Sequence, residues 1–198
     1  MEKRLEIGGQ RQLDGWTDFG YQNGGGNIIF DDITCDDNYL SEVYWSHVIE
    51  HIPYCNIEDV IKKIYDKLEP NGKLRTVCPD LEKMIWAYNN NDTSQWDRSK
   101  NHWGSMANRG IYPILGVGGM LMAGVCGSES TLKAPRPETY LTDTSGNVFG
   151  TISHVAGWDY TMLSNLLKHV GFSRVERTEI TDFDLHPQGG QLCVNAYK

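Results

Sequence analysis

Residues 42–77 alternate between the patterns of a strand, a helix and a second strand, and this alternation constrains the fold most. Apolar residues between Ile57 and Leu68 recur at the three- and four-residue spacing of one helix face, while acids and lysines occupy the other face. Short apolar runs at Glu42–Trp45 and Lys73–Val77 predict strands on either side, and Glu69-Pro70-Asn71-Gly72 predicts the turn before the second. This order predicts a parallel βαβ unit and therefore an α/β sheet.

Both ends of the chain extend the predicted sheet. Arg4–Ile7 and Asn27–Asp31 are apolar runs typical of buried parallel strands. Near the C-terminus, Tyr160–Val170 has helical spacing, and Val175–Ile180 and Leu192–Tyr197 predict two further strands. A turn rich in Pro and Gly joins these last two strands, so we expect an antiparallel hairpin.

The length of the chain bounds the number of domains. With 198 residues, it has the size of one domain, which spans about 100 to 200 residues. We therefore expect residues 1–198 to form a single domain. Residues 85–155 break the alternation of strands and helices and are rich in Gly, Asn, Ser and Trp. We expect them to form an irregular insertion that covers the site as a lid or an acceptor-binding element.

Charge and composition narrow the partners and the compartment. The 18 Lys and Arg against 26 Asp and Glu give a net charge of −8, so we expect no nucleic-acid partner. The longest apolar stretch, Ile111–Val125, is interrupted by Pro and Gly and is shorter than the roughly 20 residues that span a membrane. The N-terminus lacks the apolar core of a signal peptide, and the 5 cysteines are widely spaced. We therefore expect a reducing, cytoplasmic location without membrane insertion.

Acidic and small residues stand at the predicted carboxyl ends of the strands. Ligands of open α/β sheets bind outside these ends, so the residues there are the first candidates for a site. They are Glu6 with Gly8 and Gly9, Asp31 and Asp32, Ser46 and His47, and residues 78–80.

Several motifs, in order and spacing, resemble the class I S-adenosylmethionine-dependent methyltransferases, in particular a small group of the type 11 kind. The matching stretches are Leu5-Glu6-Ile7-Gly8-Gly9-Gln10, Asp14-Gly15-Trp16, Phe30-Asp31-Asp32-Ile33, Ser46-His47-Val48-Ile49-Glu50-His51, residues 68–75, residues 77–81 and residues 154–172. The resemblance implies a Rossmann-like, seven-stranded, mostly parallel sheet with a C-terminal antiparallel hairpin. It implies S-adenosylmethionine as the cofactor and a small molecule, with a saccharide as one candidate, as the methyl acceptor.

The resemblance also implies roles for individual residues. The cofactor-binding set consists of Glu6, Gly8 and Gly9 at the methionine part, Asp18 as the acid nearest the ribose position, Asp32 and Ile33 at the adenine, and Ser46 near the sulfonium. His47 and His154 are the candidate catalytic bases for an acceptor that must lose a proton. For His154, which precedes a predicted helix capped by Asp159, a packing role is the alternative.

Two positions depart from the family pattern. Gln10 stands where the glycine turn of the family has its second glycine, and Gly20 stands where the family has the acid that binds the ribose. The family's usual helix before the first strand is also expected to be missing. A binding protein that keeps the fold without catalysis is therefore an alternative function. A homodimer or a partner protein that covers the open site is also considered.

The stretch His47-x-x-Glu50-His51 also matches the inverted zinc-protease motif, with two imidazole ligands and a carboxylate base. That site needs both histidines inside one helix, whereas His47 directly follows a predicted strand and Pro53 follows His51 closely. A zinc hydrolase is therefore a remote alternative. As the alternative to a zinc ligand, we expect His51 to have a structural role and to form a hydrogen bond at the start of a helix.

Overall fold

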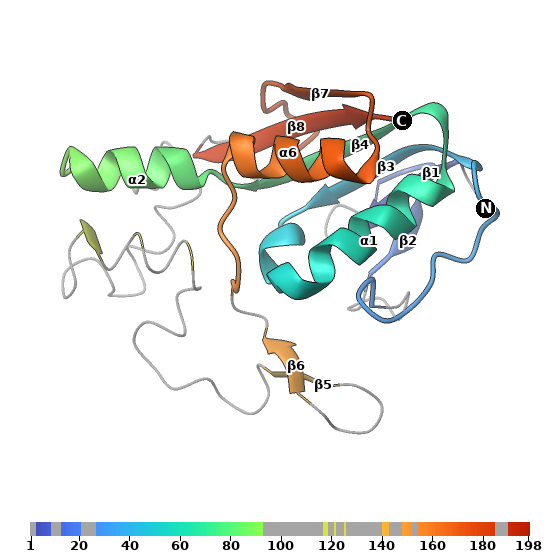
Figure 1. Cartoon of the computed structure of the whole chain (residues 1–198), viewed down its shortest axis with the longest axis horizontal. Helices are drawn as coiled ribbons and strands as arrows, with labels where there is room; N and C mark the ends of the chain where they lie inside the picture. Colours follow the sequence, from blue (N-terminus) through green and yellow to red (C-terminus); the bar gives the residue numbers. More distant parts are fainter. Residues whose placement is uncertain are drawn as a thin grey trace.

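A computed structural model describes residues 3–8, 13–20, 27–92, 117–118, 121, 125, 140–142, 148–151, 154–184 and 190–198. It has a six-stranded sheet in the order β2-β1-β3-β4-β8-β7, and helices pack against it (Figure 1). The strands are β1 (Arg4–Ile7), β2 (Thr17–Phe19), β3 (Leu40–Ser46), β4 (Leu68–Pro79), β7 (Arg174–Arg177) and β8 (Gln191–Tyr197). The helices are the 3-10 helix η2 (Ile49–His51), α1 (Tyr54–Lys67), α2 (Leu81–Asn89) and α6 (Tyr160–Val170).

Strand direction divides the sheet into two parts. β2, β1, β3 and β4 are mutually parallel, and β8 runs antiparallel to both β4 and β7. The predicted α/β class, the βαβ unit and the C-terminal hairpin are therefore confirmed. Seven strands were predicted for this sheet, whereas the residues that the structure describes form six. A separate pair, β5 (Tyr140–Thr142) and β6 (Val148–Thr151), forms an antiparallel hairpin within the predicted insertion 85–155.

The missing strand is the one predicted at Asn27–Asp31, which forms a turn. Local hydrogen bonds explain the difference. The Asn27 side chain accepts from the Ile29 amide at 3.0 Å, and Asp31 accepts from the Asn27 amide at 2.6 Å. Such side-chain contacts compete with strand pairing. Ile28 is nevertheless buried, so this apolar run contributes to the core without entering the sheet.

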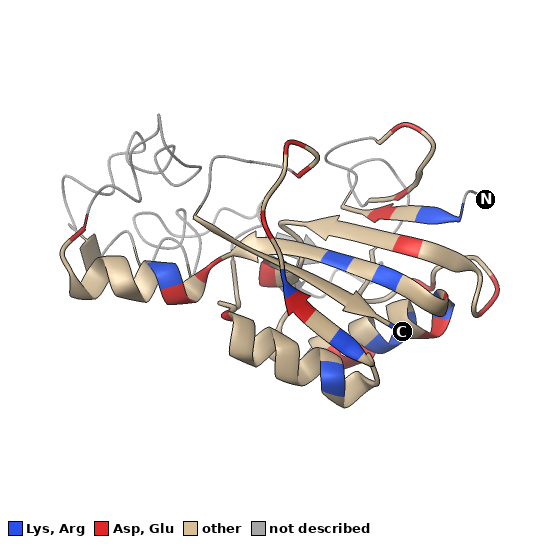
Figure 2. Ribbon diagram, turned by 90° about the horizontal axis from the view of Figure 1, so that it is seen from above, with Lys and Arg blue, Asp and Glu red and all other residues tan. Residues whose placement is uncertain are grey.

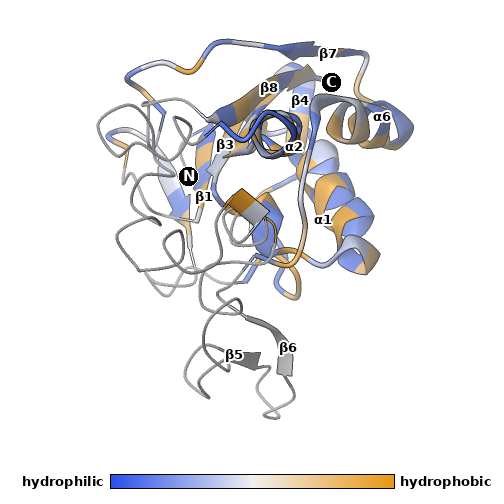
Figure 3. Ribbon diagram, turned by 90° about the vertical axis from the view of Figure 1, so that its left-hand side faces the viewer, coloured by the Kyte–Doolittle hydropathy of each residue, from blue (hydrophilic) through white to orange (hydrophobic). Residues whose placement is uncertain are grey.

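Helices α1 and α6 cover one face of the sheet (Figure 3). The apolar face of α1 packs against strand residues such as Leu5, Val43 and Trp45, which are fully buried. Its buried positions are Ile57, Val60, Ile61 and Ile64, which are those that the sequence spacing predicts. Helix α6 has the predicted bounds, with Asp159 as its N-cap accepting from the Met162 amide at 2.8 Å.

The opposite face of the sheet carries a row of polar and aromatic residues, one from each strand. Strand register places Asp18, Glu6, Tyr44, Arg75, Asn195 and Glu176 side by side across the sheet. The Arg75 guanidinium is bound by the buried Asp184, at 2.8 Å from Nε to Oδ1, which anchors the segment after β7 on this face. Trp16 and Phe183 pack against Tyr44 there.

Helix α2 was not predicted, because the sequence around residue 85 was assigned to the irregular insertion. It begins at the buried Asp80, whose carboxylate accepts from the Lys83 amide at 3.3 Å and pairs with Arg177.

Acidic and basic residues are interspersed along the strands and helices drawn in Figure 2. No helix within the described ranges has both the length and the apolar character needed to cross a membrane.

Candidate functional site

The carboxyl end of β1 brings together a buried acid and a glycine. Glu6 is 2% exposed, and its carboxylate accepts from the Leu13 amide at 3.1 Å. Gly8 has a φ of +100°, and a Cβ on it would lie 2.7 Å from Cγ2 of Val48. Any side chain at this position would therefore be strained and would clash. Gly8 thus packs directly against the chain segment that follows β3, whereas Gly9 and Gln10 lie outside the described residues.

Two further predicted residues lie on the same face of the sheet as Glu6. Asp18 of β2 is the register partner of Glu6, so the two carboxylates belong to neighbouring strands. Ser46 ends β3 two residues after Tyr44, which also pairs with Glu6. The Ser46 hydroxyl is buried and has no hydrogen-bond partner among the described residues. The structure therefore brings Glu6, Asp18 and Ser46 together near Gly8, and their roles at a cofactor stay predictions.

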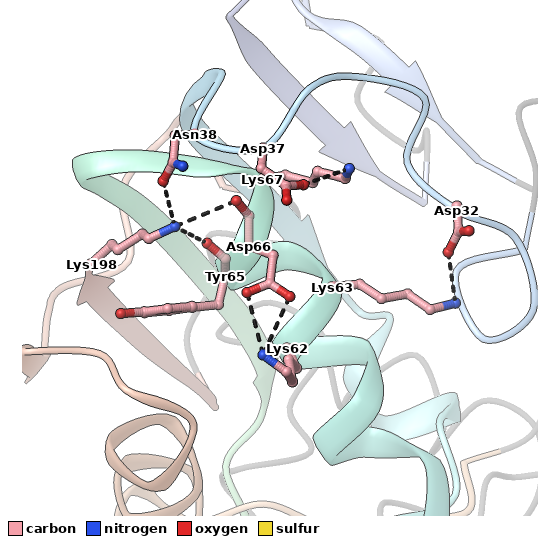
Figure 4. A network of polar contacts seen from close by, with 9 residues as sticks. All are labelled: Asp32, Asp37, Asn38, Lys62, Lys63, Tyr65, Asp66, Lys67 and Lys198. Carbon is pink, nitrogen blue, oxygen red and sulfur yellow. Dashed lines mark hydrogen bonds and ion pairs between the residues drawn. The ribbon is translucent and has the colours of Figure 1, made fainter.

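Asp32 and Ile33 are placed away from this group. The Asp32 side chain is 87% exposed and lies 3.7 Å from the Lys63 ammonium, in the C-terminal half of α1 (Figure 4). Lys63 also donates to the carbonyl of Asp31, at 3.3 Å, and so fixes the turn before Asp32. Ile33 is buried in the hydrophobic core. Their predicted roles at an adenine stay predictions, and nothing in this arrangement supports them.

His47 lies at the turn where the chain leaves β3. Its φ of +55° is a left-handed conformation, which costs a non-glycine residue about 1 kcal/mol or more. Its amide donates to the Val77 carbonyl at 2.9 Å, which holds the turn against β4. The ring Nδ1 lies 2.9 Å from Glu50 Oε1, and Nε2 lies 2.8 Å from Gln191 Oε1. Both ring nitrogens are therefore engaged.

Glu50 is the centre of a cluster of histidines. It is 1% exposed and is faced by His47, His51 and His154. The His154 Nε2 lies 3.9 Å from Glu50 Oε1, and the rings of His51 and His154 meet edge to face at 5.0 Å. His154 is far from Glu50 in the sequence. It is held near Glu50 because the amides of Val155 and Ala156 donate to the Glu50 carbonyl at 2.8 and 3.1 Å.

The charges in this cluster support one another. Burial opposes ionisation of Glu50, but the three neighbouring imidazoles outweigh it and lower the pKa of Glu50 to about 2. Burial likewise opposes protonation of His47, but Glu50 and the hydrogen bond to Gln191 raise the pKa of His47. The imidazoles around the buried Glu50 carboxylate therefore favour its ionised form. The thiol of Cys78 is also buried, and burial together with Glu50 raises the pKa of Cys78 well above its ordinary value.

The cluster differs from the zinc-protease arrangement considered for the sequence. In that motif His47 and His51 would be the ligands and Glu50 the base. Here His47 is turned to Glu50 and Gln191, and the donor atoms that converge are those of Glu50, His51 and His154. The roles of Glu50 and Gln191 were not predicted. No pattern in the sequence pointed to Gln191. Glu50 belonged to the zinc-protease motif, but that motif does not include His154, which faces Glu50 in the structure.

The residues at the β1 and β3 ends suit a cationic cofactor in chemical type. A sulfonium and an ammonium group would be bound by acids such as Glu6 and Asp18. The Ser46 hydroxyl offers a buried group that could still bond to a ligand. The residues present therefore fit S-adenosylmethionine, although Gly20 leaves the usual ribose acid without a counterpart at its position.

Comparison with known proteins finds similarity in structure alone. No family profile and no curated protein sequence matches the chain. A protein of Nostoc punctiforme named as a candidate O-methyltransferase superposes with a TM-score of 0.50 at 12% identity, covering 98% of this chain and 51% of that one. The S-adenosylmethionine-dependent methyltransferase SibL gives a TM-score of 0.50 at 11% identity, covering 98% and 50%. A protein of Bordetella parapertussis described as a possible exported protein gives 0.51 at 10% identity, covering 98% and 61%.

The chain therefore spans about half the length of the first two of these proteins. At identities near 10%, such likeness concerns the fold and carries no residue roles. The third protein has the same fold without a methyltransferase name. Taken with the six-stranded sheet, the comparison shows that this chain has the Rossmann-like fold of the class I S-adenosylmethionine-dependent methyltransferases.

Proposed function

We propose that the chain is an S-adenosylmethionine-dependent methyltransferase that acts on an oxygen or nitrogen atom of a small molecule. The observation that carries the proposal is the pairing of Glu6 with Asp18 in register, beside the positive-φ Gly8, at the carboxyl end of a parallel sheet. This is where ligands of such sheets bind. When bound, the cofactor would supply a methyl group activated by a positive sulfur.

The proposed roles follow from charge and burial. Glu6 is nearly inaccessible, so it would bind a cation without competition from water, where such contacts are stronger. Asp18 would bind hydroxyl groups or a second positive group from the neighbouring strand. The buried hydroxyl of Ser46 would orient a polar group at the end of β3. Asp32 is left out of the set, because it is exposed and paired with Lys63.

Of the two predicted bases, His154 is the better placed to accept a proton from the acceptor. His47 has both ring nitrogens engaged by Glu50 and Gln191, so we propose that it positions Glu50. His154 is 13% exposed at its side chain, and its Nε2 is 3.9 Å from the ionised Glu50. A base must lie within reach of the acceptor, and a partly exposed ring is more accessible than the buried ring of His47.

Calorimetric titration with S-adenosylhomocysteine tests the proposal without an acceptor. We expect saturable binding by the wild-type chain. Glu6→Gln should weaken it about 10-fold or more, because a hydrogen bond to a charged group contributes about 1.5 to 3 kcal/mol. Asp37→Asn, at the opposite end of the sheet, is the matched control and should bind as the wild type does. The absence of heat at millimolar ligand would reject the proposal.

A binding protein without catalysis is the second candidate, because Gly20 and Gln10 replace two residues of the family pattern. Gln10→Gly distinguishes the two. Tighter binding of S-adenosylhomocysteine by this variant would indicate an impaired cofactor site. Unchanged, negligible binding in both proteins would favour the non-catalytic function.

A further inference from the structure

Glu50, His51 and His154 form a donor cluster at the carboxyl end of the sheet, and the proposed methyl transfer does not require all three. One ligand atom from each residue lies within 4.8 Å of the other two. Oε1 of Glu50 is paired with the His47 ring, but Oε2 accepts no hydrogen bond from the described residues. A carboxylate that is 1% exposed normally has partners for both oxygens. Its unused oxygen indicates a missing ligand.

We propose that Glu50, His51 and His154 bind a divalent transition-metal ion, with Zn²⁺ as the best match. Two imidazoles and one carboxylate are the protein ligands of several catalytic zinc sites, in which a fourth position stays open. Carboxylate and imidazole donors without a thiolate also suit other first-row divalent ions. This inference rests on the three side chains and does not depend on the proposed cofactor.

The backbone holds the three ligands in place before any ion binds. Glu50 and His51 are neighbours in η2, so their separation is fixed locally. His154 is held by the two amides that donate to the Glu50 carbonyl. Gly157, three residues after His154, is held as well. The Tyr54 hydroxyl donates to the Gly157 carbonyl at 2.7 Å and accepts from the Gly157 amide at 3.1 Å. The segment that carries His154 is thus attached to η2 and to the start of α1.

His47 completes the site as a positioning residue. Through Nδ1 it holds Oε1 of Glu50, and through Nε2 it is held by Gln191. Metal ligands are commonly oriented by such outer contacts. Donors on one zinc ion lie at most about 4.2 Å apart, given bonds of about 2.1 Å. The cluster must therefore contract slightly on binding, which rotation of the His51 and His154 rings can provide.

The proposed ion changes the role of His154. An imidazole that coordinates a metal has no lone pair left to accept a proton. In a metal-loaded chain, the ion itself would lower the pKa of a hydroxyl or water at its open position. The site then lies beside the residues proposed to bind the cofactor, because Val48, in the same segment as Glu50, packs against Gly8.

The test is calorimetric titration of the chain of residues 1–198 with ZnCl₂, after treatment with a chelator and dialysis. We expect one site per chain in the wild type. His51→Ala and His154→Ala should each weaken binding by more than about 100-fold, and the positioning variant His47→Ala by about 10- to 100-fold. His169→Ala is the matched control, because His169 also faces a glutamate, Glu58, at 3.2 Å, but on the surface. It should leave binding unchanged.

Spectroscopy of the wild type provides a readout that does not depend on the folding of any variant. Co²⁺ bound in place of zinc should give the visible absorption of a low-coordinate site with nitrogen and oxygen ligands, without thiolate charge transfer. A thiolate band would overturn the proposal, since it would place the ion on cysteines. Absence of saturable zinc binding, or equal loss in His169→Ala and His154→Ala, would also overturn it.

Discussion

The amino edge of the parallel sheet, where its strands begin, and its carboxyl edge, where they end, differ in the partners of their acidic residues. At the amino edge, acids and polar groups meet lysines on the surface, as in the network of Figure 4. Lys67 pairs with Asp37 at 2.9 Å, and Lys198 donates to Asn38 at 2.9 Å and to the Tyr65 carbonyl at 2.8 Å. At the carboxyl edge, Glu50 is buried and faces three imidazoles instead of a lysine.

The difference has an energetic meaning. Exposed ion pairs contribute little, because water screens them and both side chains lose freedom. A buried carboxylate is costly to keep, and apolar residues of similar volume would often serve stability equally well. The acids of the amino edge therefore fit a role in solubility and local order. The carboxyl edge retains the buried charge of Glu50 despite its cost in stability, and such charges are typical of functional sites.

The largest effect should come from Glu50→Ala. Three imidazoles would lose their shared carboxylate, and a cavity would form beside His47. We expect the free energy of unfolding to fall by about 3 kcal/mol, measured by urea denaturation at pH 6. A loss within experimental error would remove the energetic distinction between the two edges.

The pH dependence of stability should report the same carboxylate. The folded-state pKa of Glu50 is lowered from 4.5 to about 2, so its contribution is present above pH 4.5 and is lost as the pH falls toward 2. The pKa of His47 is raised from 6.5, so its contribution is present below pH 6.5 and is lost as the pH rises through the folded value. The free energy of unfolding, measured at several pH values from 3 to 8, should vary less with pH for Glu50→Ala than for the wild type. Parallel curves would contradict this assignment.

Asp80 tests whether position at the carboxyl edge is enough to make an acid functional. It is fully buried, but it caps α2 and pairs with Arg177, so its partners are those of a structural residue. Asp80→Ala should lower stability by about 1 to 2 kcal/mol through loss of the cap. The Kd for S-adenosylhomocysteine and for zinc should not change. A large change in either Kd would assign Asp80 to the site.

The smallest effect should come from Asp37→Asn at the amino edge. Hydrogen bonding to Lys67 lowers the pKa of Asp37, yet the Asp37 side chain is 67% exposed. We expect no measurable change in the denaturation midpoint, in low salt or in 0.5 M salt, a concentration roughly sufficient to screen surface pairs. A clear loss that salt abolishes would give this network a greater role in stability than its exposure indicates.

Local pattern was sufficient for the elements whose burial follows a simple period. The spacing of Ile57, Val60, Ile61 and Ile64 predicted α1, and α6 has the bounds that its pattern predicted. The sequence also placed Glu6 and Gly8 at the carboxyl end of β1, because strand ends in a parallel sheet share one edge.

Other features were decided by tertiary structure. Thr17–Phe19 became the strand beside β1, although the stronger apolar run was Asn27–Asp31, because local side-chain hydrogen bonds hold the latter in a turn. His47 meets Gln191, which is 144 residues away, only because β8 pairs with β4.

His154 lies beside Glu50 because two amides after it bond to the Glu50 carbonyl. The sequence by itself therefore determined the α/β class, helices α1 and α6, and the residue types at the strand ends. The tertiary structure decided which of those residues meet, because long-range pairing and burial select partners that no local spacing encodes.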